Sequence, residues 1–423
     1  MQTRTKLLAL AAAVVAGLAV VWAFLPASRE ATGEATPEAA PTEPTPPEPA
    51  APAPGPDAEA RARIGAILAQ LERRADERDD DWLTLEQLAG GYLERQRLTG
   101  DWEDFARAEA ALERAFTRAP AGAGPFLARA QLHYTLHRLD RIEEDLAAVE
   151  RFAIVRDEQR RAVRVMRANV ALQSGRYDEA RDAFDALLAE ARERDALTGA
   201  AGHRVAIGAH DEAHALLAEA EQEASGAGAM VRAWLCLVRG LVDLEAGALD
   251  EALAHYRRGL ALMPGWYLIE EHIAEVLAEQ GHHDEALTIY AAVIERTGDP
   301  ELVDAAAGVH EARGERAQAE ALRQRAHAGH EARIAAFPTA AFGHALDHFL
   351  EHEGDAARAV ELAEQNRDVR PNGEAWTKLA RAYLGVGRVD DARAALAEVE
   401  RMPFRSSELT ETRDALAAAE AAR

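Results

Sequence analysis

Residues 376–403, WTKLARAYLGVGRVDDARAALAEVERMP, contain the pattern that decides the fold. From Trp376 onward, Trp, Leu, Ala and Tyr stand at i, i+3, i+4 and i+7, which places them on one face of an α-helix. Gly387 ends this helix in a short turn, and a second apolar face follows from Ala392. Pro403 ends the second helix because proline cannot continue one. The stretch therefore predicts a helical hairpin.

The same unit recurs along the chain at intervals that cluster near 33 or 34 residues. Most copies carry an alanine in the second helix and a glycine in the preceding turn, and the turns have similar sequences, such as SGRYDEA, GALDEA and GHHDEA. The aspartate in these turns is the type of residue that caps a helix N-terminus. With a degenerate copy near residues 125–151 and a first copy with an enlarged turn, the sequence predicts about nine hairpins. The marker alanines are Ala108, Ala180, Ala213, Ala252, Ala286, Ala319, Ala359 and Ala392, and the marker glycines are Gly175, Gly208, Gly247, Gly281, Gly314, Gly354 and Gly387.

This unit resembles the tetratricopeptide repeat (TPR) family, whose pattern is W-x2-L-G-x2-Y followed by A, F, A and P. The copy at 376–403 has Ala380 where the family usually has glycine and Leu396 where it usually has phenylalanine. The resemblance extends over roughly residues 80–403. It implies an all-α fold, a right-handed superhelical solenoid in which the first helix of each hairpin lines a concave surface. It also implies a role in holding protein partners.

The N-terminal residues 1–26 predict a membrane anchor. Arg4 and Lys6 precede an uncharged run at residues 7–25, which would span about 28 Å as a helix. Basic residues before the run and acidic residues after it predict that the N-terminus stays in the cytoplasm. A cleaved signal peptide is the alternative, although the sequence around Pro26 is a poor cleavage site.

Residues 27–58 are rich in proline, alanine and glutamate and predict an extended, negatively charged linker. Residues 59–423 are then the TPR solenoid, closed by a C-terminal capping helix. The predicted location is the inner membrane of a bacterium, single-pass, with the folded part in the periplasm. If the N-terminal segment is cleaved, the protein is instead exported as a soluble chain.

Composition excludes several classes of function. The chain has 73 acidic and 48 basic residues, a formal charge of −25, and this field would repel nucleic acid. The single cysteine, Cys236, allows no disulfide framework and lies in an apolar stretch typical of an inert core thiol. No phosphate-binding loop, G-x-S-x-G, H-E-x-x-H or CxxC motif occurs, so no enzyme activity is expected.

The repeat register predicts which residues line the concave groove. Its acidic character either selects a basic peptide segment or only keeps the solenoid soluble. Trp234 either adds an apolar anchor beside the acidic face or packs on the preceding hairpin. The predicted groove residues are Trp234, Leu237, Leu241, Glu271, Glu275, Glu279, Glu301, Asp304, Glu311, Thr377 and Arg381.

The same register places a histidine stripe in the groove. His344, His348 and His352 stand at i, i+4 and i+8, a spacing at which neighbouring imidazoles can share a divalent transition metal with nearby carboxylates. The alternatives are unliganded, solvated histidines and a pH-sensing role. His327 and His330, one helical turn apart, are interpreted as ordinary surface residues.

Together these patterns predict a non-catalytic scaffold or adaptor of the bacterial envelope, anchored in the membrane, that captures a basic segment of a partner protein in its groove. The alternative function is a metal-binding accessory protein that uses the histidine stripe. No other cofactor is expected.

Overall fold

The computed structural model describes residues 56–78, 81–351 and 356–423, and this part of the chain is α-helical without strands. Most of the predicted linker and the whole predicted anchor lie outside the described residues. The first described helix, α2 (Pro56–Glu77), begins just inside the predicted linker. None of the described helices has the length and apolar character needed to span a bilayer.

Within the described residues, nine helical hairpins follow α2, in agreement with the prediction of about nine, and α21 (Ser407–Ala421) packs against the last one. Two short 3-10 helices also occur, η1 (Leu139–Arg141) in the turn between α5 and α6 and η2 (Ala224–Gly226) between α10 and α11. The first helices of the hairpins are α3 (Trp82–Thr99), α5 (Phe126–Thr135), α7 (Asp157–Gln173), α9 (Arg194–Ala206), α11 (Ala229–Glu245), α13 (Tyr267–Glu279), α15 (Pro300–Ala312), α17 (Pro338–Glu351) and α19 (Gly373–Gly385). The second helices are α4 (Glu103–Arg118), α6 (Ile142–Glu150), α8 (Tyr177–Glu190), α10 (His210–Glu223), α12 (Leu249–Leu262), α14 (His283–Thr297), α16 (Arg316–Ala336), α18 (Ala356–Val369) and α20 (Val389–Glu400).

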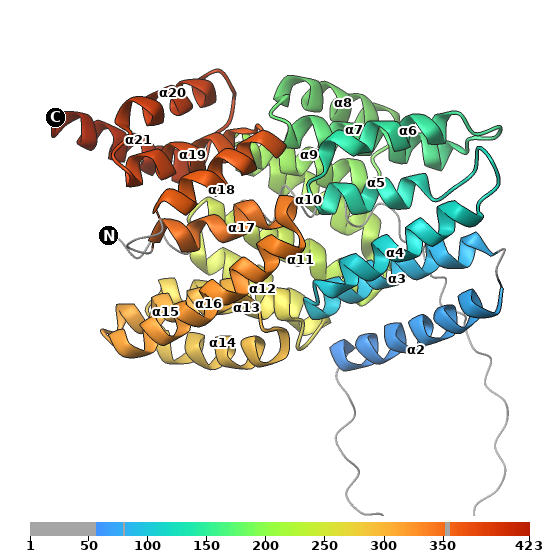
Figure 1. Cartoon of the computed structure of the whole chain (residues 1–423), viewed down its shortest axis with the longest axis horizontal. Helices are drawn as coiled ribbons and strands as arrows, with labels where there is room; N and C mark the ends of the chain where they lie inside the picture. The colour runs from blue at the N-terminus through green and yellow to red at the C-terminus, as the bar shows by residue number, and fades with distance from the viewer. Residues whose placement is uncertain (1–55, 79–80, 352–355) are drawn as a thin grey trace, which may run out of the picture.

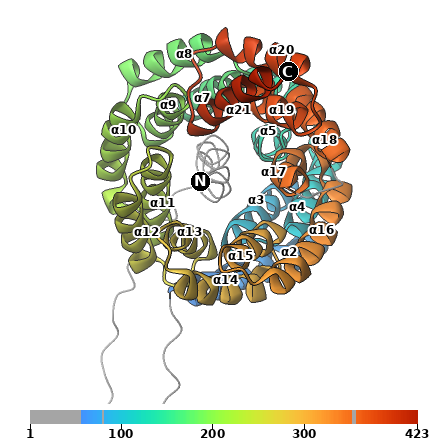
Figure 2. The ribbon, with the colours of Figure 1, turned by 90° about the vertical axis from the view of Figure 1, so that its left-hand side faces the viewer.

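The hairpins follow a coil about a central axis (Figure 1). Viewed along this axis, the odd-numbered helices α7 to α19 form an inner layer and the even-numbered helices α8 to α20 an outer layer (Figure 2). The first helix of each of these hairpins therefore faces the axis, as the resemblance implies.

In the turns inside the hairpins, the marker glycines adopt the turn conformation that the sequence predicts, but the aspartates do not cap the second helices as predicted. Each described marker glycine has a φ between +72° and +82°, a conformation that suits glycine because it has no Cβ. The aspartates lie inside the first turn of the second helices, as Asp250 does in α12, and no side-chain cap bond forms there. They act through the helix dipole, which favours negative charge near an N-terminus.

Successive turns of the coil stack on one another, so that segments about 160 to 200 residues apart in the chain are in contact. Nε1 of Trp266 donates to the carbonyl of Arg97 at 3.0 Å, and the hydroxyl of Thr339 donates to that of Leu136 at 2.6 Å. The hydrophobic cores show the same stacking. One core cluster contains side chains of both α7–α9 and α17–α21, and another joins α2–α4 to α11–α16.

Candidate functional site

The apolar groove residues predicted on α11 lie inside the hydrophobic core. Trp234 is 1% exposed, and Leu237 and Leu241 are fully buried. α11 is buried almost continuously from Ala233 to Leu244 because it carries apolar residues on every face. The prediction that Trp234, Leu237 and Leu241 bind a partner is therefore wrong. Trp234 packs within the array, which is the other alternative that the sequence left open.

Two predicted groove carboxylates on α13, Glu271 and Glu275, are buried as well. His272 lies between them, with Nδ1 2.9 Å from Oε2 of Glu275 and Nε2 3.6 Å from Oε1 of Glu271. Burial raises the pKa of both carboxyl groups. Their prediction as partner ligands is wrong because both side chains are enclosed within the array, with 6% and 3% of their surface exposed.

Three further predicted residues differ in exposure. Thr377 is fully buried, and its hydroxyl donates to the carbonyl of Gly373 at 2.7 Å, so its prediction as a groove residue is wrong. Glu279 is half-buried. Glu311 is exposed and pairs with Arg323 of the outer helix α16.

Arg381 belongs to an ion-pair network in the last inner helices. Its guanidinium donates to Asp347 of α17 at 2.7 Å and to Glu408 of α21 at 2.9 Å. Lys378 lies 3.3 Å from the same aspartate. Burial alone would raise the pKa of Asp347, but the two cations lower it to about 2. Arg381 thus ties α17, α19 and α21 together.

The predicted histidine stripe is divided between two carboxylates of α15. Nδ1 of His344 lies 3.1 Å from Oε2 of Glu301, whereas Nδ1 of His348 lies 2.9 Å from Oδ2 of Asp304. His352 lies outside the described residues. His344 and His348 therefore do not form the shared site that their spacing predicts.

A compact cluster forms instead around Asp304, from three helices. His330 of α16 places Nε2 2.8 Å from Oδ2 of Asp304, the same oxygen that His348 of α17 approaches. One ligand atom from each of these three residues lies within 4.8 Å of the other two. We call Asp304, His330 and His348 the Asp304 cluster.

His330 is only 2% exposed, so its interpretation as a surface residue is wrong. The signal was present in the length of α16, which continues for 21 residues from Arg316 to Ala336. Because α16 is this long, His330 in its C-terminal half lies beside both α15 and α17. His327, one turn earlier, places Nδ1 3.2 Å from Nε2 of His348.

The carboxylates of α15 are held in their charged form. Burial opposes ionisation of Asp304, but hydrogen bonds from His330 and His348 lower its pKa below the usual value. Burial likewise opposes ionisation of Glu301, whose pKa falls to about 2 beside His344 and Arg333. These two predicted groove carboxylates therefore already have hydrogen-bond partners within the structure.

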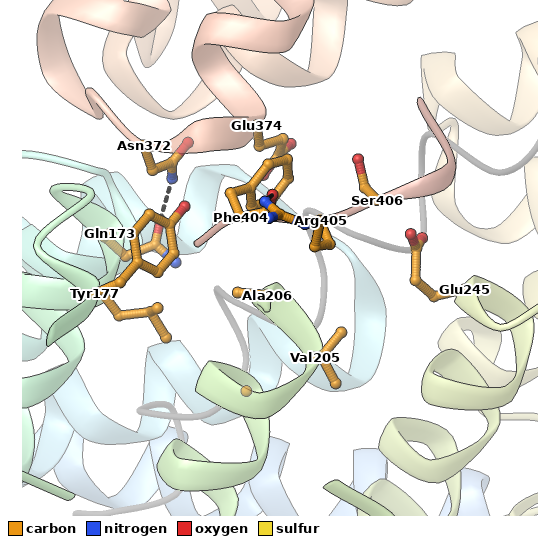
Figure 3. A pocket seen from close by; sticks show the side chains of 12 residues that line it. Gln173, Tyr177, Val205, Ala206, Glu245, Asn372, Glu374, Phe404, Arg405 and Ser406 are labelled. Atoms are coloured by element: carbon orange, nitrogen blue, oxygen red, sulfur yellow. Dashed lines mark hydrogen bonds between the residues drawn. The ribbon is translucent and has the colours of Figure 1, made fainter. Parts of the chain in front are cut away.

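A small pocket lies where the C-terminal segment meets the earlier turn of the coil (Figure 3). Glu245 comes from the end of α11 and Glu374 from the start of α19, so the two carboxylates approach from different elements. Tyr177 and Phe404 contribute aromatic walls. The complete lining is Leu172, Gln173, Tyr177, Gly202, Val205, Ala206, Glu245, Asn372, Glu374, Phe404, Arg405 and Ser406.

The polar side chains of this pocket differ in whether they have hydrogen-bond partners. Oε1 of Glu245 accepts a hydrogen bond from the amide of Ser407 at 3.1 Å, and burial raises the pKa of this carboxyl group to about 7. Oε1 of Glu374 is buried without a hydrogen-bond partner, 3.8 Å from Nζ of Lys378. Arg405 donates instead to the backbone carbonyl of Phe404 at 2.6 Å. Sequence reasoning missed this pocket because its lining comes from segments about 200 residues apart.

Cys236 is buried, as predicted for a core thiol. Nε of Arg258 donates to its Sγ at 3.2 Å, and burial raises the pKa of the thiol. A raised pKa lowers the thiolate fraction at neutral pH, which disfavours nucleophilic chemistry.

A family model described as "Tetratricopeptide repeat" matches residues 243–309, from the end of α11 to α15. A search of curated protein sequences found no match to this chain.

Solved structures to which the chain is similar include MamA, yeast Tom70 and YrrB. MamA is 18% identical over 40% of this chain and 96% of that chain, with a TM-score of 0.33. Tom70 is 13% identical over 85% of this chain and 96% of that chain, with a TM-score of 0.38. YrrB, described as a TPR protein with an unusual peptide-binding site, is 21% identical over 51% of this chain and 86% of that chain, with a TM-score of 0.27.

Proposed function

We propose that this chain is a tetratricopeptide repeat protein and that it acts as a non-catalytic scaffold, which holds a basic segment of a partner protein. The observation that carries the proposal is the pocket between Glu245 and Glu374. A lysine or arginine side chain entering it would meet the carboxyl groups of Glu245 and Glu374. Oε1 of Glu374 accepts no hydrogen bond, although Nζ of Lys378 lies 3.8 Å from it.

The walls of the pocket suit the stem of such a side chain. Tyr177 and Phe404 offer apolar surface to the methylene groups of lysine or arginine, which pack along apolar surface while the charged end stays polar. Arg405 also lines the pocket, but its guanidinium is engaged with backbone carbonyls. The charge of −25 would steer a basic segment toward the molecule.

Site-specific photo-crosslinking in cells tests this proposal. A photoreactive residue at Arg405, on the rim of the pocket, should capture one defined protein, and the contact should map to a lysine- or arginine-containing segment. The same residue at Arg393, exposed on the outer helix α20, is the matched control and should not capture it. Glu374→Gln should strongly reduce capture from position 405. Capture that is equal at both positions, or unchanged by Glu374→Gln, would refute the proposed pocket.

We further propose that residues 7–25 anchor the scaffold in a bacterial inner membrane with the folded part in the periplasm. The length of the uncharged run and the basic residues before it support this placement. A C-terminal alkaline phosphatase fusion should be active and a C-terminal green fluorescent protein fusion dark. Carbonate extraction should leave the chain in the membrane, whereas release would favour cleavage. A bright fluorescent fusion would contradict the orientation.

A further inference from the structure

We propose that Asp304, His330 and His348 form a binding site for a divalent transition metal ion of the zinc, nickel or cobalt type. Within the described ranges, this is the group of histidine, cysteine and acidic residues whose ligand atoms converge within 4.8 Å. Two imidazoles and a carboxylate are the donor set that such ions take in proteins. The proposal does not depend on the partner pocket, with which the Asp304 cluster shares no residue.

The ligand atoms are nearly at the separation that a metal requires. Both imidazoles approach Oδ2 of Asp304, His330 at 2.8 Å and His348 at 2.9 Å. Tetrahedral ligands at a zinc distance of about 2.0–2.1 Å lie about 3.3 Å from one another. Each imidazole nitrogen would therefore need to move only about half an ångström away from Oδ2 of Asp304 to reach that separation.

The cluster is also held rigidly. Its members come from α15, α16 and α17, and His330 and His348 are 2% and 4% exposed. Their rings lie 4.9 Å apart, centroid to centroid. Side chains fixed on packed helices lose little freedom when they coordinate an ion, and such preorganisation favours binding.

A neighbouring histidine, His327, contacts one of the proposed ligands. Nδ1 of His327 lies 3.2 Å from Nε2 of His348, so it contacts the imidazole nitrogen that faces away from Asp304. Hydrogen-bonded partners of this kind orient a ligating imidazole and increase its basicity. Three protein ligands leave the fourth tetrahedral position to water or to a group from a partner.

A second histidine–aspartate–histidine group provides an internal comparison. Asp243 accepts from His214 through Oδ1 at 2.8 Å and from His255 through Oδ2 at 2.6 Å. The two imidazoles use different oxygens, and their rings are 6.2 Å apart. Because they do not converge on one point, we infer that this group is an interhelical hydrogen-bond network and not a metal site.

The bound ion would connect two successive hairpins. Asp304 and His330 belong to the α15–α16 hairpin, and His348 belongs to α17 of the next one. Since a ligand that binds only the folded state stabilises it, metal should raise the melting temperature.

Calorimetric titration of the full chain in detergent with Zn²⁺, Ni²⁺ and Co²⁺ tests the site. We expect one ion per chain with micromolar affinity for at least one metal. His330→Gln should weaken binding by at least about tenfold and His327→Ala by about tenfold or more. His214→Ala, which removes a histidine from the Asp243 network, is the matched control and should leave affinity unchanged. Absence of binding by the wild type at sub-millimolar metal, or equal affinity in His330→Gln and wild type, would overturn the proposal.

A readout on the wild-type protein keeps the test independent of how the variants fold. X-ray absorption of the zinc-loaded chain should show two imidazoles and oxygen donors in the first shell. A first shell of oxygen alone would place the ion elsewhere and overturn the assignment. Exposed histidines such as His282 would give weak binding without the melting-temperature increase expected for the cluster, and that outcome would also overturn it.

Discussion

The indole of Trp266 donates its hydrogen bond to the backbone carbonyl of Arg97, 169 residues earlier in the chain. Trp266 precedes α13 and is 1% exposed, while Arg97 lies in the last turn of α3. The contact therefore joins the first hairpin to the sixth. Nearest-neighbour packing alone would leave a solenoid open, with each repeat touching only the adjacent ones. Here the stacked turns add long-range contacts, which bury inner-layer residues that an open solenoid would expose.

Trp266→Phe should destabilise the fold by about 2 kcal/mol, because the carbonyl of Arg97 loses its donor and the smaller ring leaves a cavity. The measurement is urea unfolding of the full chain followed by circular dichroism. Trp376→Phe, at a half-buried indole of α19, is the control and should cost less than about 1 kcal/mol. Equal losses in the two variants would argue against a special contribution from the contact between turns.

Gly175→Ala should be more damaging than Gly387→Ala, although both glycines occupy the same turn of their hairpins. Their φ values are nearly equal, +73° and +72°, so both alanines carry the same left-handed strain of about 1–2 kcal/mol. A Cβ at Gly175 would lie 2.5 Å from the carbonyl oxygen of Pro371, whereas a Cβ at Gly387 meets no atom within 4 Å. The difference in unfolding free energy therefore isolates the contact between stacked turns. If the two variants unfold at the same urea concentration, that contact contributes nothing.

The repeat pattern predicted the hairpins because it depends on local spacing. Trp376 and the residues after it specify a helix, Gly387 specifies a left-handed turn, and the period repeats both. The structure has the predicted number of hairpins, with the first helices inside. The prediction that aspartates such as Asp250 cap the second helices is wrong, because the helix begins two residues earlier than an N-cap at Asp250 would require.

The Asp304 cluster and the pocket could be predicted only in part, because the repeat register describes only contacts between neighbouring repeats. Asp304 and His348 lie on adjacent inner helices, and the pattern placed both on the same face. His330 was missed because it belongs to an outer helix, where surface positions are usually solvated. The pocket at Glu374 depends on how distant turns stack, and no feature of local periodicity encodes that.

Gly240→Ala should destabilise the chain by about 1–3 kcal/mol through overpacking. A Cβ at Gly240 would lie 2.3 Å from the ring of Tyr256, which belongs to the second helix of the same hairpin. Gly308→Ala is the control, because a Cβ there meets no atom within 4 Å and alanine is the better helix former. That variant should be more stable by up to about 1 kcal/mol. Unfolding curves of the two variants that shift in the same direction would contradict the packing argument.

Glu245→Gln should stabilise the protein at pH 8 but not near pH 5. Burial raises the pKa of Glu245 from 4.5 to about 7 in the folded state, and Glu408 and Glu374 add to this increase. The folded chain therefore binds more protons than the unfolded chain between these values, and stability falls as pH rises through this window. The contribution is fully present below about pH 4.5 and lost above about pH 7. The shift corresponds to roughly 3 kcal/mol.

Glutamine keeps an oxygen that can accept from the amide of Ser407 but cannot ionise, so it imitates the protonated glutamate at every pH. The expected gain over wild type is up to roughly 3 kcal/mol at pH 8 and close to zero at pH 5, measured by urea unfolding at both pH values. Glu295→Gln, at an exposed position near the end of α14, is the matched control and should change stability little at either pH. A gain of equal size at pH 5 and pH 8 would show that Glu245 does not titrate in this window, because only an ionisation difference between the folded and unfolded chains makes the gain depend on pH.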